Sequence, residues 1–240
     1  MLLCMFHLLS SMYREAKEYI FPVFCLSCDA EGRWVCDSCF STITITPQLF
    51  CPVCHASSVA GNACVSCAPT SYIVNHIATV RYEDVGLIGK SIHIFKYQYA
   101  EEVMEVIDRI ITIFVSEYRT FFHDIDFLIP IPLHKKRFAE RGFNQATSIA
   151  RVLSRELGIA LRDTAVVRTR DTPHQARLDK EGRLQNVKEA FGVPDSEGIA
   201  QKRVLLVDDV LTTGATMQEC AKVLLDHGAS QVSAFTLARG

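Results

Sequence analysis

Two periods of apolar and polar residues run through most of the chain and mark its strands and helices. Residues 76–82 alternate with a period of two, which predicts a β-strand. Residues 127–133 and 203–207 are apolar almost throughout, as is typical of strands covered on both faces of a sheet. Two further strands are expected over residues 164–168 and 231–238.

Four longer stretches carry apolar residues at helical spacing. They predict helices over residues 87–99, 101–118, 143–157 and 216–227. Gly158 and Gly228 follow the last two stretches and are suited to end a helix. Because strands alternate with helices, we expect an α/β fold with a largely parallel sheet that is covered on both faces.

The N-terminal residues are apolar enough to resemble an export signal, but they lack a basic leading segment and a small-residue cleavage site. Residues 5–20 place apolar side chains on one side of a helix, so residues 1–24 are expected to form an amphipathic packing helix. No run of 18 apolar residues occurs, and therefore no membrane span is expected. These features favour a cytoplasmic protein.

Composition changes sharply near residue 70. Residues 25–71 contain eight of the ten cysteines, a single arginine and no lysine, whereas the α/β pattern begins just afterwards. We therefore expect a small cysteine-rich head over residues 25–71 and an α/β domain over residues 75–240. The 25 basic and 27 acidic residues nearly balance, so no strong overall field draws the protein onto nucleic acid or anionic lipid.

The clustered cysteines form four Cys-x-x-Cys pairs. The pairs are Cys25 with Cys28, Cys36 with Cys39, Cys51 with Cys54, and Cys64 with Cys67. Two such pairs complete a tetrahedral zinc site with no open position, so the head is expected to be a double zinc ribbon with two structural Zn²⁺ ions. Four disulfides are the alternative, and the lack of an export signal argues against them.

The ligands of the two ions can be divided in two ways. Sequential pairing joins residues 25, 28, 36 and 39, and then 51, 54, 64 and 67, whereas cross-braced pairing would interleave the pairs. Sequential pairing closes short loops and is favoured for that reason. Because the head is poor in Lys and Arg, a scaffold or docking role is favoured over direct DNA contact.

The segment from 204 to 217 carries the most specific chemistry. A buried strand delivers Asp208 and Asp209, and a Thr/Gly loop over residues 212–216 then opens into a helix. Open α/β sheets bind ligands at this edge, and the free N–H groups of a helix start suit a phosphate. An acidic pair beside a phosphate suits a sugar diol and Mg²⁺. Neither a Walker A loop nor a dinucleotide fingerprint is present.

These residues resemble the signature with which type I phosphoribosyltransferases bind phosphoribosyl pyrophosphate (PRPP). Residues 129–146 and 168–191, together with the cysteine-rich start, resemble the ComF/GntX family, which is associated with competence and DNA uptake. The resemblance covers nearly the whole chain, and Arg-Gly-Phe-Asn-Gln at 141–145 is its most specific block. It implies a Rossmann-like parallel sheet of the type I phosphoribosyltransferase kind, preceded by a double zinc ribbon.

The resemblance also implies roles for individual residues. Asp208 and Asp209 would hold the ribose hydroxyls and Mg²⁺, and the loop from Pro132 would face the pyrophosphate through Arg137 and Arg141. The remaining PRPP-binding residues would be Lys136, Thr212, Thr213, Gly214, Ala215 and Thr216. A solvated basic loop is the alternative for residues 132–141. Residues 169–189 are polar, lack a period and are the expected mobile flap.

The implied reaction is a glycosyl transfer, in which a nitrogen nucleophile displaces pyrophosphate from C1 of PRPP. Thr212 stands where purine-salvage relatives carry a carboxylate, so a purine acceptor bound through that acid is disfavoured, and the acceptor is left open. Two alternatives remain beside an enzyme. One is a module that binds PRPP or a nucleotide without turnover, and the other is an adaptor for single-stranded DNA or a protein of the competence machinery.

Overall fold

In the computed structural model, the described residues are 22–97, 101–172, 186–196 and 198–240. The helix expected over residues 5–20, Cys4 and most of the expected flap lie outside them. Within the described part of the chain, no helix is both long and apolar enough to cross a membrane.

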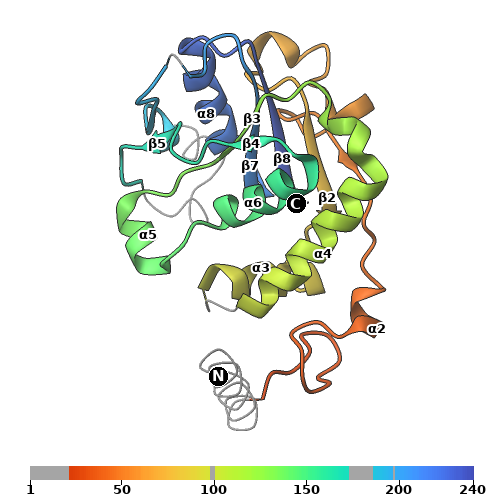
Figure 1. Cartoon of the computed structure of the whole chain (residues 1–240). Coiled ribbons are helices and arrows are strands. Elements are labelled where there is room, and N and C mark those ends of the chain that lie inside the picture. Colours follow the sequence, from red (N-terminus) through yellow and green to blue (C-terminus); the bar gives the residue numbers. More distant parts are fainter. Residues whose placement is uncertain (1–21, 98–100, 173–185, 197) are drawn as a thin grey trace, which may run out of the picture.

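The centre of the molecule is a six-stranded sheet (Figure 1). In spatial order its strands are β1 (Gln48–Leu49), β2 (His76–Arg81), β8 (Gln231–Arg239), β7 (Arg203–Leu211), β3 (Phe127–Pro130) and β4 (Ala160–Leu161). All neighbours pair in parallel except β1, which is antiparallel to β2. The expected α/β fold with a mainly parallel sheet is confirmed. Strand β7 continues past the predicted end at residue 207, because its pairing with β8 runs on to Leu211.

Helices cover both faces of the sheet. One face carries α3 (Leu87–Tyr97), α4 (Glu101–Tyr118) and α6 (Gln145–Leu157), and α8 (Ala215–Asp226) lies on the other (Figure 1). Alternate residues of β7 point to opposite faces: Leu205 joins the core under the first group of helices, and Leu206 joins the core under α8. The bounds predicted for α4 agree with the structure.

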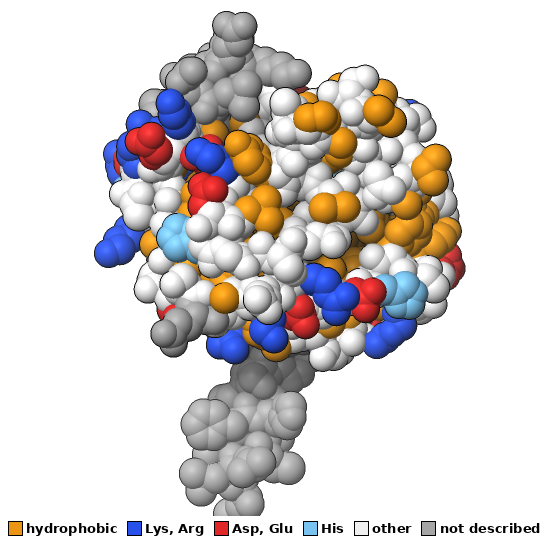
Figure 2. Space-filling model, turned by 90° about the horizontal axis from the view of Figure 1, so that it is seen from above, with side chains coloured by type: hydrophobic (Ala, Val, Ile, Leu, Met, Phe, Trp, Pro, Cys, Tyr) orange, Lys and Arg blue, Asp and Glu red, His pale blue; other side chains and the backbone are white. Residues whose placement is uncertain are grey.

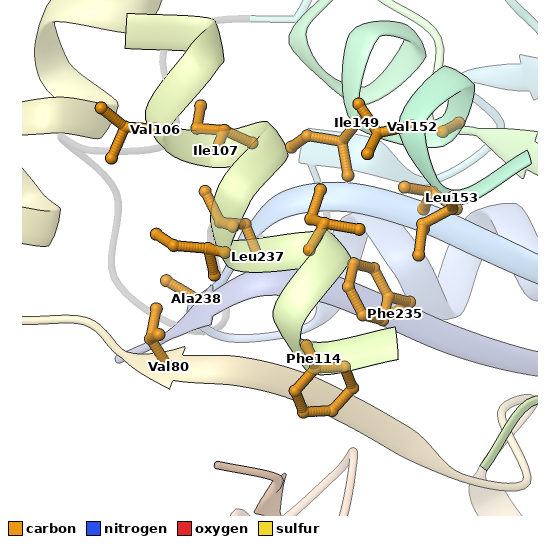
Figure 3. Packing of buried hydrophobic residues seen from close by; sticks show 14 of the residues in the cluster. Val80, Val106, Ile107, Phe114, Ile149, Val152, Leu153, Phe235, Leu237 and Ala238 are labelled. Carbon is orange, nitrogen blue, oxygen red and sulfur yellow. The ribbon is translucent and has the colours of Figure 1, made fainter. Parts of the chain in front are cut away.

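The core on the first face is built around aromatic rings and branched side chains (Figure 3). Phe114 of α4 is fully buried, and its ring centroid lies 6.2 Å from that of Phe235 on β8 and 6.3 Å from that of Phe122. Such edge-to-face contacts add to the ~1.5–3 kcal/mol that burial of a large apolar side chain contributes. On the opposite face, Cys220 of α8 is buried in the second core, as expected for a small apolar side chain.

Capping residues set the ends of α6. The Asn144 side chain accepts a hydrogen bond from the backbone N–H of Ala146, and Gly158 ends the helix with a left-handed φ of 73°. The stop predicted at Gly158 is therefore confirmed.

The segment expected to be a loop from Pro132 differs from the prediction. Residues Lys135–Arg141 form a short helix, α5, whose first turn is capped by His134 and whose last turn is closed by Gly142 with φ 77°. Lys, Arg, Ala and Glu are good helix formers, and they need no apolar stripe for one exposed turn or two.

The cysteine-rich head packs directly on the α/β domain. It contains α2 (Asp37–Phe40), β1 and the short 3₁₀ helices η1 (Val59–Gly61) and η2 (Ala68–Thr70). Phe40 belongs to the core on the first face, and the guanidinium of Arg109 on α4 lies 3.8 Å above its ring. Arg109 also forms a 2.9 Å ion pair with Asp37. The head and the sheet therefore share a core, and the domain boundaries drawn from composition stay a prediction.

The remaining described elements are η3 (Arg119–Phe122) and a two-stranded ribbon of β5 (Val167–Arg168) and β6 (Phe191–Gly192). From Ser38 to Val80 the chain has no Lys, Arg, Asp or Glu. Figure 2 shows a face on which charged side chains gather to one side and along the edge, beside a wide area of apolar and uncharged side chains.

Candidate functional site

The acidic pair lies near the carboxyl end of β7. Asp209 is only 7% exposed, whereas Asp208 is partly accessible, and the backbone N–H of Asp209 donates a 2.9 Å hydrogen bond to Oδ1 of Asp208. Burial among protein atoms raises the pKa of Asp208 to about 7, and the neighbouring Asp209 carboxylate adds to the effect. Two adjacent carboxyl groups of this kind are suited to a diol or a divalent cation.

A lysine that the sequence analysis did not single out completes the acidic end of the site. Nζ of Lys96, in the last turn of α3, lies 3.0 Å from Oδ2 of Asp209. Desolvation lowers the pKa of Lys96, but the Asp209 carboxylate outweighs it, and the pKa is raised overall. Only the fold brings Lys96 to this edge, so no local spacing in the sequence could have revealed it.

The predicted phosphate loop lies between β7 and α8. Gly214 has a left-handed φ of 74° and precedes the first helical residue, Ala215. The first N–H groups of a helix have no partner within the helix and are available to an anion. In the described part of the structure, the buried hydroxyl of Thr213 has no hydrogen-bond partner. Thr212 is exposed, and Thr216 lies in the first turn of α8.

The head lies against this loop at Pro52. A Cβ added to Gly214 would lie 3.1 Å from the carbonyl oxygen of Pro52, which stands between Cys51 and Cys54. Further along α8, the Gln218 side chain accepts a hydrogen bond from the backbone N–H of Tyr72. Glycine at 214 is therefore favoured by its left-handed backbone conformation, and a larger residue would require the Pro52 carbonyl to move by a few tenths of an ångström.

The three basic residues predicted to face pyrophosphate lie on α5 and point to different partners. Arg137 donates a 2.6 Å hydrogen bond from Nη2 to the carbonyl oxygen of Thr172. The guanidinium of Arg141 lies 5.3 Å from the ring centroid of Tyr97, the neighbour of Lys96. Lys136 is 68% exposed and lies 3.8 Å from Asp171. Arg141 is thus near the acidic end, and Arg137 is near the start of the expected flap.

The eight cysteines of the head gather into two groups of four. The groups are Cys25, Cys28, Cys36 and Cys39, and Cys51, Cys54, Cys64 and Cys67. Within each group the sulfur atoms all lie within 4.8 Å of one another, which confirms sequential grouping. The Sγ atoms of Cys28 and Cys36 are 3.6 Å apart, and those of Cys54 and Cys64 are 3.7 Å apart.

These distances fit a metal site. A tetrahedron with Zn–S bonds of about 2.3 Å has sulfur atoms about 3.8 Å apart, whereas a disulfide requires about 2.05 Å. Burial raises the pKa of the Cys25 and Cys51 thiols, but backbone N–H groups outweigh it and lower both pKa values to about 6. Each group therefore contains one thiol, Cys25 or Cys51, that ionises readily to the thiolate that Zn²⁺ binds.

The two groups are built alike. The backbone N–H of Cys25 donates a hydrogen bond to the carbonyl oxygen of Ala30, and that of Cys51 donates one to the carbonyl oxygen of Ala56, each at 2.8 Å. Each closed turn aims two sulfur atoms at one point, and the shared architecture makes the head a tandem repeat. The repeated Phe-Cys-x-x-Cys at residues 24–28 and 50–54 is the sequence signal of this duplication.

Comparison with known proteins agrees with this architecture. The family described as "Phosphoribosyl transferase domain" matches residues 101–240. The "DNA utilization protein YhgH" of Shigella flexneri is 31% identical, with 91% of this chain and 97% of that protein covered. "Competence protein ComFC" of Bacillus subtilis (strain 168) is 29% identical, with 95% and 100% covered. The chain therefore belongs to the ComF/YhgH family, with a phosphoribosyltransferase domain and two four-cysteine clusters in its N-terminal region.

Proposed function

We propose that this protein binds PRPP together with Mg²⁺ at the carboxyl end of β7 and transfers its phosphoribosyl group to a nitrogen nucleophile. The observation that supports this most directly is the acidic pair followed at once by the loop at the start of α8. A phosphoribosyl group carries a diol and a phosphomonoester at its two ends. The carboxylates suit the diol, and the free N–H groups of the loop and of α8 suit the phosphate.

Each end of the site has an unmet requirement that such a ligand would satisfy. The buried Thr213 hydroxyl would gain a phosphate oxygen as its partner. At the other end, a pKa of about 7 leaves Asp208 partly protonated near neutral pH, and a bound cation would favour its ionised form. Asp208 and Asp209 would hold Mg²⁺, and that ion would supply charge neutralisation for the departing pyrophosphate.

The acceptor side of the reaction is proposed only as a chemical class. A nitrogen nucleophile is the group that attacks C1 of a phosphoribosyl donor, and the chain has Thr212 rather than a carboxylate in the phosphate loop. Arg137 and Arg141 are proposed to neutralise the pyrophosphate, because guanidinium groups match its oxygens in geometry and charge.

The two cysteine groups are proposed to hold one structural Zn²⁺ each. Four thiolates close a tetrahedral site and leave no position for a water molecule, so neither ion would take part in the reaction. The second ion would fix the turn that carries Pro52 against the phosphate loop.

A role in DNA handling is the second candidate. The relatives are named for DNA utilization and competence, and α5 exposes an aromatic ring beside two lysines. Phe138 is 49% exposed, and both Lys135 and Lys136 are exposed. Aromatic rings that stack on bases, with cations for the phosphates, are the features that bind single-stranded DNA. A protein of the competence machinery is the other partner that these names suggest.

Calorimetry with Mg²⁺–PRPP and with ribose 5-phosphate tests the proposed site. The double variant Asp208→Asn/Asp209→Asn should lose PRPP binding, whereas Asp226→Asn at the exposed far end of α8 should bind as the wild type does. Release of pyrophosphate in the presence of a panel of nucleobases then separates transfer from binding without turnover. Unchanged PRPP affinity in the double variant would refute the site.

A further inference from the structure

Arg168 is a buried cation outside the residues assigned so far. It ends β5, pairs in register with Phe191 of β6 and is only 8% exposed. Its guanidinium lies 5.4 Å from the centroid of the Phe191 ring. In the described part of the structure, no carboxylate lies within ion-pair distance of Arg168, and its Nε is buried without a hydrogen-bond partner.

One threonine accepts hydrogen bonds from two guanidinium groups. Nη2 of Arg168 donates to the hydroxyl of Thr172, and Nη2 of Arg137 donates to the carbonyl oxygen of the same residue. Thr172 is itself buried. The two arginines come from β5 and α5, so their convergence is set by the fold and cannot be read from their spacing in the sequence.

The positive charges of Arg168 and Arg137 favour the binding of an anion. Desolvation lowers the pKa of Arg168, and the positive charge of Arg137 lowers it further. Asp208 and Asp171 act in the opposite direction from beyond ion-pair distance. Phe191, which the guanidinium contacts, packs in the same core as Leu206 and Leu211 of β7, the strand that carries the acidic pair. A buried charge without a close counter-ion is strongly destabilising, and a buried N–H without an acceptor adds to that cost.

We propose that Arg168 and Arg137 form a clamp for a diphosphate anion beside the acidic pair, with Nε of Arg168 as a donor kept for that ligand. The clamp deepens the proposed function, on which its link to PRPP rests. In this arrangement Arg141 contributes its charge to the pyrophosphate at longer range, because its guanidinium donates to Gln145 and lies against Tyr97. Phe191 and Thr172 hold the Arg168 guanidinium in position before the ligand arrives.

Inorganic pyrophosphate is the probe for the clamp. Arg168→Met keeps the apolar part of the side chain but removes the guanidinium, with its charge, its donors and its contact with Phe191. It should weaken pyrophosphate binding on the order of tenfold to hundredfold, the loss expected for a charge-assisted contact. Arg168→Lys should recover part of the affinity. Ribose 5-phosphate, which lacks the diphosphate, should bind both variants as it binds the wild type.

Thermal unfolding without ligand separates the clamp from a structural role. Arg168→Met should leave the Tm unchanged or raise it, because it removes a buried charge that has no carboxylate partner among the described residues. The matched control is Arg162→Met, which removes an arginine that lies 4.7 Å from the Phe127 ring away from the site and should leave pyrophosphate binding unchanged. Arg137→Met on α5 provides a second variant of the clamp and should weaken pyrophosphate binding as well.

The results that overturn the clamp are distinct from those that overturn the proposed function. A lower Tm in Arg168→Met with unchanged pyrophosphate affinity would show that Arg168 only supports the fold. Wild-type protein that binds ribose 5-phosphate but not pyrophosphate would also overturn the clamp and leave the phosphate loop untouched. Pyrophosphate binding through Arg168 without ribose 5-phosphate binding would support the clamp and contradict the proposed function.

Discussion

Two glycines with the same backbone conformation offer a controlled test of the contact between the head and the phosphate loop. Gly214 has φ 74° at the start of α8, and Gly158 has φ 73° at the end of α6. A Cβ at Gly158 would meet nothing within 4 Å, whereas a Cβ at Gly214 would meet the Pro52 carbonyl oxygen at 3.1 Å and the Leu211 side chain at 3.6 Å. Alanine should therefore cost the same backbone conformational energy at either site. Only at Gly214 would its methyl group also meet a close neighbour.

The expected magnitudes follow from these two terms. A left-handed backbone costs an L-residue about 1–2 kcal/mol, and both Gly158→Ala and Gly214→Ala should lose stability by about that amount. At Gly214 the methyl group also presses on the backbone oxygen of Pro52, and overpacking of this kind typically costs about 1–3 kcal/mol more. Gly214→Ala should therefore be the less stable variant by about 1–3 kcal/mol.

Denaturant unfolding of the two variants measures this difference, provided that the slope m stays the same. Calorimetry measures the affinity for ribose 5-phosphate. This affinity should fall in Gly214→Ala and stay unchanged in Gly158→Ala. Equal losses of stability would show that Pro52 does not press on the loop. Wild-type affinity in Gly214→Ala would show that the loop is not where the phosphate binds.

Other predictions concern the metal sites and the acidic pair. Elemental analysis should find about two zinc ions per chain. The variants Cys25→Ser and Cys51→Ser should each lose about one of these ions. Because Pro52 lies against Gly214, Cys51→Ser should also weaken ribose 5-phosphate binding, and equal affinity in the two variants would contradict a link between the second cluster and the loop. The raised pKa of Asp208, about 7, favours its protonated form in the folded protein, so its contribution to stability is present below about pH 4 and is lost as the pH rises through 7. The difference in unfolding free energy between wild type and Asp208→Asn should therefore change across this range, and a constant difference would show that the carboxyl titrates normally.

Local patterns in the sequence predicted those parts of the fold that depend on local causes. The helical stripe over residues 101–118 matches α4, and the glycine after residue 157 ends α6 as expected. The strand over residues 203–207 was predicted too short, because Asp208 and Asp209 interrupt its apolar run. Backbone pairing with β8 continues beside these polar side chains, and pairing is not visible in a hydrophobic pattern.

The candidate site likewise combines features that are local in the sequence with contacts that only the fold creates. Cysteine spacing and the Asp-Asp and Thr-Thr-Gly sequence are local features, so the two clusters and the loop could be predicted from them. Lys96 comes from a distant segment and meets Asp209 only in the folded protein, and only the fold brings Arg168 and Arg137 to the same threonine. The contact of Pro52 with Gly214 depends in turn on how the head packs, which no composition change could reveal.

A crystal structure of the protein with Mg²⁺ and PRPP is the most direct test of the proposed site. The 5-phosphate should lie within hydrogen-bond distance of the N–H groups of residues 213–216 and of the Thr213 hydroxyl. The ribose diol and the cation should lie at Asp208 and Asp209, and the pyrophosphate between Arg137 and Arg168. A ligand bound elsewhere, with the loop and the acidic pair unchanged, would refute the proposed site.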